Sequence, residues 1–235
     1  IAPTATSAAE VLIEAQGFES ANWTDGQKGN RWRYGWFSGP RPTRWFTRCG
    51  CASRTGSYAA YVSHPEAGNF CPAEYLSNQT TWFEREGLDF SGYSSVRARF
   101  WFTGKSEPSR DFLILFVRVG PESVPIIPYT NEWQFSGTMG NWSFQDVALD
   151  DYAGMNDVTV EWYFGSNGSV QYGGFVVDDI EIVGVPKIRE GDTCSSVIEL
   201  SSCLGNQTKS GTTSGYANDF STRGTGECSG EGGDS

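Results

Sequence analysis

The sequence is poor in charged residues, poorer still in basic ones, and it has no long apolar run. Only 19% of the 235 residues are charged, and 17 Lys and Arg stand against 28 Asp and Glu, which gives a formal net charge of −11. This negative charge opposes binding to nucleic acids and to anionic membranes. The longest apolar run, residues 112–117, is far too short to span a bilayer. We therefore expect no nucleic-acid partner and no direct insertion into a membrane.

The scarcity of histidine argues against catalysis. His64 is the only histidine, which excludes a zinc site with HExxH spacing, and the sequence has no GxSxG elbow. Two carboxylates can hydrolyse a glycoside, but the acidic pairs here are chain neighbours, at 150–151 and 178–179. Neighbours on a strand face opposite ways and cannot flank one bond. We therefore predict that the chain is not an enzyme.

The residues that are abundant favour β structure. The chain has 29 Gly, 10 Pro and 14% aromatic residues, a mixture of turn and strand formers. Apolar and polar residues alternate over 96–102 and 158–164, which predicts strands with one apolar face, and the run 112–117 predicts a central strand. A strand is also expected over 11–15, although 7–10 has the spacing of a capping box before a short helix. The predicted fold is an all-β jelly-roll β-sandwich.

Cysteines and glycosylation sequons indicate a secreted or cell-surface protein. Each half of the chain holds three cysteines, so at least one per group must pair with the other group, pair with another molecule or stay free. Five Asn-x-Ser/Thr sequons favour a eukaryotic secretory route, although a bacterial exported protein could carry them by accident. The predicted disulfide residues are Cys49, Cys51, Cys71, Cys194, Cys203 and Cys228. The predicted glycosylation sites are Asn22, Asn78, Asn141, Asn167 and Asn206.

A stretch without clear periodicity, residues 22–71, holds four of the nine tryptophans and reads as a loop-rich insertion. An aromatic face can stack on the apolar side of a sugar ring while arginine binds the hydroxyls. In the alternative interpretation the same tryptophans cover the ends of the sandwich and the arginines are solvated. The candidate ligand-binding residues are Trp32, Trp36, Arg44 and Trp45.

Several motifs occur in an order that resembles the jelly-roll modules of the MAM and carbohydrate-binding type. These motifs are Gly17-Phe18-Glu19-Ser20 and residues 55–62, 88–93, 142–154 and 174–182. The resemblance covers about residues 10–184 and implies a jelly-roll domain over 1–185. It also implies a non-catalytic extracellular recognition or adhesion module that binds glycans or proteins.

The resemblance implies a structural calcium ion, and the sequence gives a separate reason to look for one. On the strand 175–183, alternation places Asp178 on the same side as Ile180 and Ile182, toward the core. A buried carboxylate needs a partner, and Ca²⁺ takes six to eight oxygen ligands. The expected ligands are Glu19, Asp178 and Asp179. The alternative is a carboxylate capped by backbone amides or by an arginine.

Residues 186–235 differ in character from the rest of the chain. They hold few large apolar residues, and they resemble the start of a β-sandwich domain that follows the catalytic domain in secreted peptidases. Such a short segment must dock on the jelly roll, be completed by another chain, or continue in a longer polypeptide. Two alternative functions follow. One is a structural subunit of a fibre, matrix or appendage that assembles with other copies, and the other is an accessory domain of a secreted hydrolase.

Overall fold

The computed structural model describes residues 9–19, 24–25, 32–38, 44–46, 52–63, 74–120 and 130–187. The chain divides into two units, Ile1–Pro186 and Lys187–Ser235, and nearly all of the described residues belong to the first. The predicted C-terminal β segment over 186–235 therefore lies almost wholly outside the described residues. In the part of the chain that the structure describes, no helix is long and apolar enough to cross a membrane.

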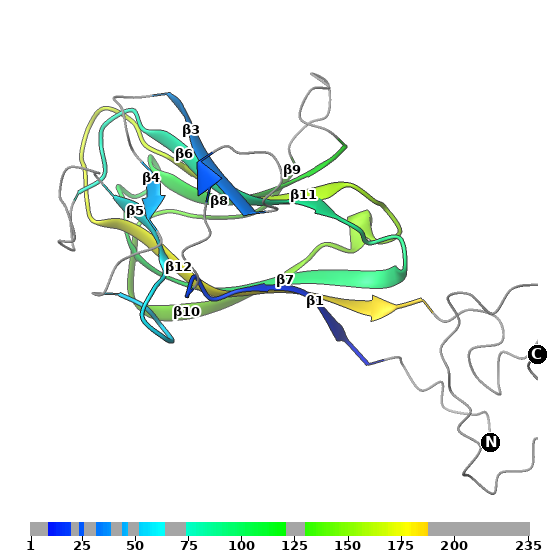
Figure 1. The fold of residues 1–235 in the computed structure, drawn as a ribbon. Coiled ribbons are helices and arrows are strands. Elements are labelled where there is room, and N and C mark those ends of the chain that lie inside the picture. The colour runs from blue at the N-terminus through cyan, green and yellow to red at the C-terminus, as the bar shows by residue number, and fades with distance from the viewer. Residues whose placement is uncertain are drawn as a thin grey trace, which may run out of the picture. The chain divides into compact units, whose positions relative to one another are not determined.

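Sheet A forms one layer of the first unit (Figure 1). Its strands are β1 (Val11–Gln16), β4 (Arg44–Phe46), β5 (Ala60–Ser63), β7 (Tyr93–Lys105), β10 (Thr138–Ala148) and β12 (Gly174–Pro186). The order is β10-β7-β12-β5-β4, and β1 also pairs with β12. All pairs in this sheet are antiparallel. Because β5 pairs with β12 over 176–177 and β1 pairs over 180–184, these two short strands share one edge of β12.

Sheet B forms the other layer. Its strands are β2 (Thr24–Asp25), β3 (Trp32–Ser38), β6 (Thr80–Leu88), β8 (Phe112–Val119), β9 (Thr130–Phe135) and β11 (Val158–Gly165). The order is β2-β3-β6-β11-β8-β9, antiparallel except for the parallel β2–β3 pair. A single 3-10 turn, Asp150–Tyr152, interrupts the strands in the described residues. The predicted all-β sandwich is confirmed.

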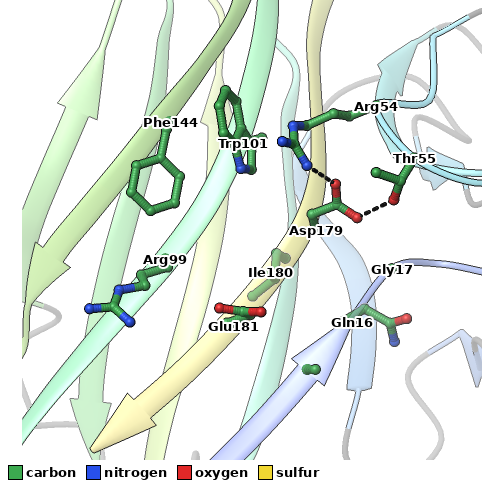
Figure 2. Close-up of a pocket in the computed structure, with 11 residues that line it drawn as sticks. Gln16, Gly17, Arg54, Thr55, Arg99, Trp101, Phe144, Asp179, Ile180 and Glu181 are labelled. Atoms are coloured by element: carbon green, nitrogen blue, oxygen red, sulfur yellow. Dashed lines mark hydrogen bonds and ion pairs between the residues drawn. The ribbon is translucent and has the colours of Figure 1, made fainter. Parts of the chain in front are cut away.

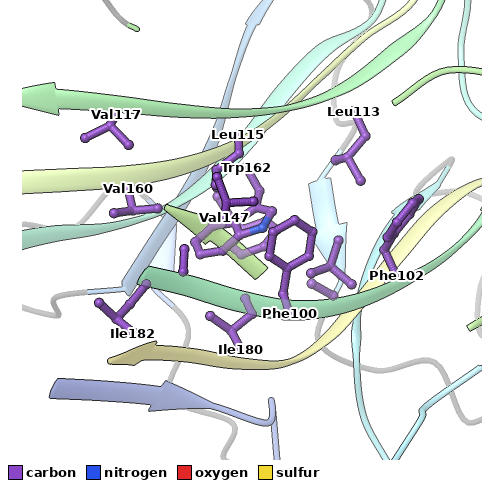
Figure 3. Close-up of a cluster of buried hydrophobic side chains, with 14 of the residues drawn as sticks. Phe100, Phe102, Leu113, Leu115, Val117, Val147, Val160, Trp162, Ile180 and Ile182 are labelled. Atoms are coloured by element: carbon purple, nitrogen blue, oxygen red, sulfur yellow. The ribbon is translucent and has the colours of Figure 1, made fainter. Parts of the chain in front are cut away.

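The core lies between the two sheets (Figure 3). Sheet A contributes Phe100, Phe102, Ile180 and Ile182, and sheet B contributes Leu113, Leu115, Val117, Val160 and Trp162. The Trp162 ring is parallel to Phe83 at 5.0 Å and perpendicular to Phe100 at 5.7 Å. The alternation predicted over 96–102 and 158–164 is confirmed, since every apolar residue on that face is buried.

Strand β12 does not keep the regular alternation that the sequence predicts. A bulge lies between Asp178 and Glu181, and Asp179 has a left-handed backbone with φ +47°. Val177 before the bulge and Ile180 after it both face the core, because the bulge shifts the phase of the strand. The predicted core-facing direction of Asp178 is therefore wrong. Its partner in the ladder is Trp101, on the outer face of sheet A.

The stretch 22–71 is part of the sandwich to a greater extent than predicted. It contains β2, β3, β4 and β5, and each of them pairs within one of the two sheets. Strand β3 alternates, with Trp32 and Tyr34 packed on the core and Arg33 and Gly35 on the outer side. This alternation is hard to read from sequence because a buried arginine and a glycine occupy the outer positions. The interpretation of the whole stretch as a loop-rich insertion is corrected accordingly.

Candidate functional site

Two aromatic rings lie next to each other on the outer face of sheet A. Trp101 of β7 and Phe144 of β10 are direct partners in the antiparallel ladder, so both side chains project from the same face. Their ring centroids are 5.2 Å apart, and 46% of Phe144 is exposed. An aromatic pair on the solvent side of a sheet contributes nothing to the core, which marks it as a candidate contact surface.

These rings line a pocket that crosses four strands of sheet A, β10, β7, β12 and β1 (Figure 2). The cavity has a volume of about 320 Å³, which is the lower end of the size range for small-ligand sites. We call it the sheet A pocket. Its lining residues are Ala15, Gln16, Gly17, Arg54, Thr55, Arg99, Trp101, Phe144, Asp179, Ile180 and Glu181.

Two arginines form polar walls of the sheet A pocket. The Arg54 guanidinium lies 3.8 Å from the centroid of the Trp101 ring, and its Nη1 is 2.6 Å from Asp179 Oδ2. Arg99 Nη1 lies 2.8 Å from Glu10 Oε2, and Arg99 Nε lies 3.4 Å from Asp146 Oδ1. The hydrogen bond with Glu10 raises the pKa of Arg99 above its usual value, with a smaller contribution from Asp146. Both arginines are thus held in fixed positions with N–H groups at the pocket.

The carboxylates of the β12 bulge anchor the neighbouring segment 52–58. Asp178 Oδ2 accepts hydrogen bonds from the backbone N–H of Arg54 at 2.8 Å and of Thr55 at 3.3 Å, and Oδ1 accepts one from Asp179 N–H. Asp178 is completely buried. Burial raises its pKa to about 6, because loss of solvent outweighs the backbone hydrogen bonds that favour the charged form.

Glu19 holds the same segment from the other side. Its Oε1 accepts hydrogen bonds from the backbone N–H groups of Ser57 and Tyr58, both at 3.0 Å. Gly56 lies so close that a Cβ there would stand 2.3 Å from Glu19 Oε1. The three residues predicted as calcium ligands therefore all contact segment 52–58. Asp178 and Asp179 contact it from β12, and Glu19 contacts it from the chain that follows β1.

The arrangement matches the alternative to calcium that the sequence left open, a carboxylate capped by amides and an arginine. Asp179 accepts from Arg54 and from the Thr55 hydroxyl, so its two oxygens are occupied as well. Within the described ranges, no group of three or more His, Cys, Asp or Glu side chains lies close enough to hold a metal ion. The described geometry therefore satisfies these carboxylates without a cation, and calcium stays a prediction.

The predicted tryptophan platform is only partly within the described side chains. Trp32 is 7% exposed and belongs to the core, where its ring stacks on Phe83 and Trp162. Trp32 is thus removed from the candidate ligand surface, because it faces sheet A rather than solvent. The side chains of Trp36, Arg44 and Trp45 lie outside the described part, although their backbones belong to β3 and β4.

The residues predicted for covalent modification are mostly outside the described ranges. This holds for all six cysteines, Cys49, Cys51, Cys71, Cys194, Cys203 and Cys228, and for Asn22 and Asn206. Asn78 and Asn141 are exposed. Asn167 is half-buried, and its Oδ1 accepts hydrogen bonds from the Ser169 backbone and hydroxyl. Glycosylation and disulfide pairing stay predictions.

Sequence reasoning missed the residues that make the sheet A pocket. Trp101 falls on the mixed face of a strand, between apolar core positions, and a tryptophan on the solvent side was the available signal. Phe144 lies three positions from the core residue Val147, so alternation places the two on opposite faces of β10. Arg54 and Arg99 gave no signal, because nothing in the sequence shows that 54 and 99 lie on one face.

The outer face of sheet B is different in character. Arg33 forms an ion pair with Glu84 and lies 3.0 Å from Glu86, and Arg118 lies 3.4 Å from Glu84. Arg33, Glu84 and Arg118 are all buried. Because these charges are buried and paired with one another, they are not available to a ligand. The sheet A pocket is therefore the better candidate.

No protein-family model matches the sequence, and no curated protein matches it. Solved structures are similar in strand arrangement. One is a xylan-binding domain from CBM 22, with a TM-score of 0.45 and 11% identity over 76% of this chain and 97% of that one. Another is the K3 cleaved adhesin domain of Lys-gingipain from Porphyromonas gingivalis, with a TM-score of 0.47 and 13% identity over 74% and 99%. The CBM22-1 xylan-binding domain from Paenibacillus barcinonensis gives 0.42 and 9% over 78% and 100%.

Proposed function

We propose that the chain is a non-catalytic module that binds a glycan in the sheet A pocket. The observation that carries this proposal is the outward-facing pair of half-buried Trp101 and exposed Phe144, 5.2 Å apart, in a cavity of about 320 Å³. We place the module outside the cytosol, on the six cysteines and five sequons of the sequence.

The pocket combines an apolar surface with hydrogen-bonding groups, as a sugar requires. A sugar ring has an apolar side made of C–H groups, which packs on an aromatic ring, and a rim of hydroxyls. Phe144 supplies the exposed ring, and Arg54 and Arg99 supply N–H donors beside it. Glu181 adds an acceptor, and Gln16, whose Oε1 already accepts from the Phe18 N–H, adds side-chain amide donors. The pocket thus has groups for both the apolar side of a sugar ring and its hydroxyls.

The carboxylates in and beside the sheet A pocket argue for binding without hydrolysis. Glycoside hydrolysis needs two carboxyl groups that flank the scissile bond. Asp178 is completely buried, and both oxygens of Asp179 are engaged by Arg54 and Thr55. Neither can act on a bound sugar while these bonds hold, which leaves Glu181 as the one carboxylate of the pocket lining that is exposed.

The proposal is tested by replacing the exposed ring. We expect Phe144→Ala to weaken binding to a retained polysaccharide about tenfold, which corresponds to roughly 1.4 kcal/mol of lost stacking. The thermal midpoint should change little, because Phe144 is 46% exposed and lies outside the core. Affinity electrophoresis in gels that contain soluble plant, fungal or bacterial polysaccharides measures the effect.

Met155→Ala is the matched control, since Met155 is also an exposed apolar side chain, at 40%, and lines no part of the pocket. It should leave retardation unchanged. If wild type and Phe144→Ala are retarded equally by every polysaccharide that retains the protein, the sheet A pocket is not the binding site. If none retains the wild type, the glycan-binding function itself fails.

A further inference from the structure

We infer that Glu181 is a specificity-determining residue of the sheet A pocket, and that the pocket accepts uncharged sugars and rejects anionic ones such as uronates and sulfated sugars. This inference rests on the proposed function and adds the charge class of the ligand. It depends on the ion pairs that already neutralise Arg54 and Arg99.

The positive charges of the sheet A pocket are not available to an anion. Arg54 is bound by Asp179 at 2.6 Å, and its guanidinium lies 3.8 Å from the centroid of the Trp101 ring. Arg99 is bound by Glu10 at 2.8 Å, and Asp146 lies 3.4 Å away. An anionic sugar would have to replace a carboxylate that is already in place, so it would gain no net ion pair.

Glu181 gives the sheet A pocket an excess of negative charge. It is exposed, it lines the pocket, and it is the cross-strand partner of Arg99 on β7 and of Ala15 on β1 (Figure 2). Among the described residues Glu181 forms no ion pair, since the Arg99 guanidinium pairs with Glu10 and Asp146 instead. Its carboxylate is therefore free to accept hydrogen bonds from sugar hydroxyls and to repel a second carboxylate.

The charges of the wider chain point the same way. The formal net charge is −11, so no long-range attraction toward a polyanion compensates for the local repulsion. A neutral sugar avoids this cost. Its hydroxyls can accept hydrogen bonds from the outward N–H groups of Arg54 and Arg99 and donate to Glu181, with no ion pair broken.

The experiment compares one polysaccharide backbone in two charge states. The probes are a soluble neutral polysaccharide that retains the wild type, such as a β-glucan, and the same polysaccharide with its C6 hydroxymethyl groups oxidised to carboxylates. We expect wild type to bind the neutral form at least about tenfold more tightly at low ionic strength. Glu181→Lys should bring the oxidised form to within about threefold of the neutral one, and added salt should weaken only that new binding.

Glu74→Lys changes the net charge by the same amount at an exposed position that lines no part of the pocket. It should keep the wild-type preference. The inference is overturned if wild type binds the oxidised form as tightly as the neutral one, or if Glu74→Lys and Glu181→Lys act alike. The proposed function can still hold in those cases, provided that Phe144→Ala weakens the retention. If no polysaccharide, neutral or oxidised, is retained by any variant, both the proposed function and the inference fail.

Discussion

At the scale of single residues, Asp178 links the β12 bulge to one wall of the sheet A pocket. Its carboxylate fixes the backbone of Arg54 and Thr55, and Arg54 in turn lies on Trp101. Because the carboxyl is buried, its pKa is raised to about 6, whereas an aspartate in an unfolded chain titrates near 3.9. The native state thus holds this proton more tightly than the unfolded state does.

This difference predicts a pH dependence with a definite sign. Between about pH 4 and pH 6 the native chain binds more protons at this site than the unfolded chain, so the free energy of unfolding falls as pH rises. The contribution of Asp178 is fully present below about pH 4 and is lost as pH passes 6. We expect the free energy of unfolding of wild type, relative to Asp178→Asn, to fall by about 2 kcal/mol from pH 4 to pH 7.

Chemical unfolding at several pH values, with a chelator present, measures this difference. A difference that is flat or rises with pH contradicts the assignment. Repeating the experiment with excess calcium in place of the chelator tests the calcium prediction, because a cation bound to Glu19 and Asp178 favours the ionised carboxylate and reverses the slope. Bound calcium should also raise the thermal midpoint. The gain in the free energy of unfolding is about 2.7 kcal/mol when free calcium is 100 times its dissociation constant. An unchanged midpoint counts against that site.

At the scale of elements, β7, β12 and β5 approach each other closely at one end of sheet A. Gly104 of β7 has φ +134°, and a Cβ there would lie 2.1 Å from the Gly174 carbonyl oxygen. Gly174 of β12 has φ +73°, and a Cβ there would lie 2.4 Å from the Val62 carbonyl oxygen. The backbones therefore meet without side chains between them, which only glycine allows.

We expect Gly104→Ala to lower the free energy of unfolding by about 2–3 kcal/mol, through the backbone clash and the unfavourable φ. Gly140→Ala is the matched control on β10, because a Cβ at that position would have no other atom within 4 Å. It should change stability by less than about 0.5 kcal/mol. Urea unfolding of both variants gives the comparison. Equal stabilities would show that the end of sheet A can move apart at little cost.

Regular strands were predictable from sequence because successive side chains alternate between the core and the outer face. Trp162 and Phe164 lie inward and Glu161 and Tyr163 outward, as alternation requires. The rule fails where one residue interrupts it. Asp178 was expected to be buried, and it is, but the bulge turned it to the outer face, and no local pattern announces a bulge.

At the scale of the whole molecule, the core and the candidate site occupy opposite faces of sheet A. Among the described residues, the main hydrophobic core lies between the sheets, and the sheet A pocket lies on the outer side of the same strands. The fold class was predictable because it depends on composition and alternation over many residues. The pocket was not, since it unites residues from positions 15 to 181 whose proximity arises only when the sheet forms.

Stability of the first unit should not depend on the C-terminal segment. Among the described residues, the main core and the side chains packed against it lie between Ile13 and Ile182. We expect a chain that ends at Lys187 to melt within about 4 °C of the full chain, the shift that roughly 1 kcal/mol produces in a protein of this size. Thermal unfolding followed by circular dichroism tests this. A much larger drop would show that residues 188–235 complete the sandwich.

The bulge in β12 lets residues at the pocket change during evolution independently of residues in the core. Since Val177 and Ile180 both reach the core across it, the strand fills the interior on either side while Asp178 and Asp179 are displaced outward. Substitutions at the lip of the pocket can therefore accumulate without altering the interior, and new ligand preferences can arise on an unchanged framework. Deleting Asp179 would remove the displacement and the ion pair with Arg54, whereas Val177, Ile180 and Ile182 would still face the core by regular alternation.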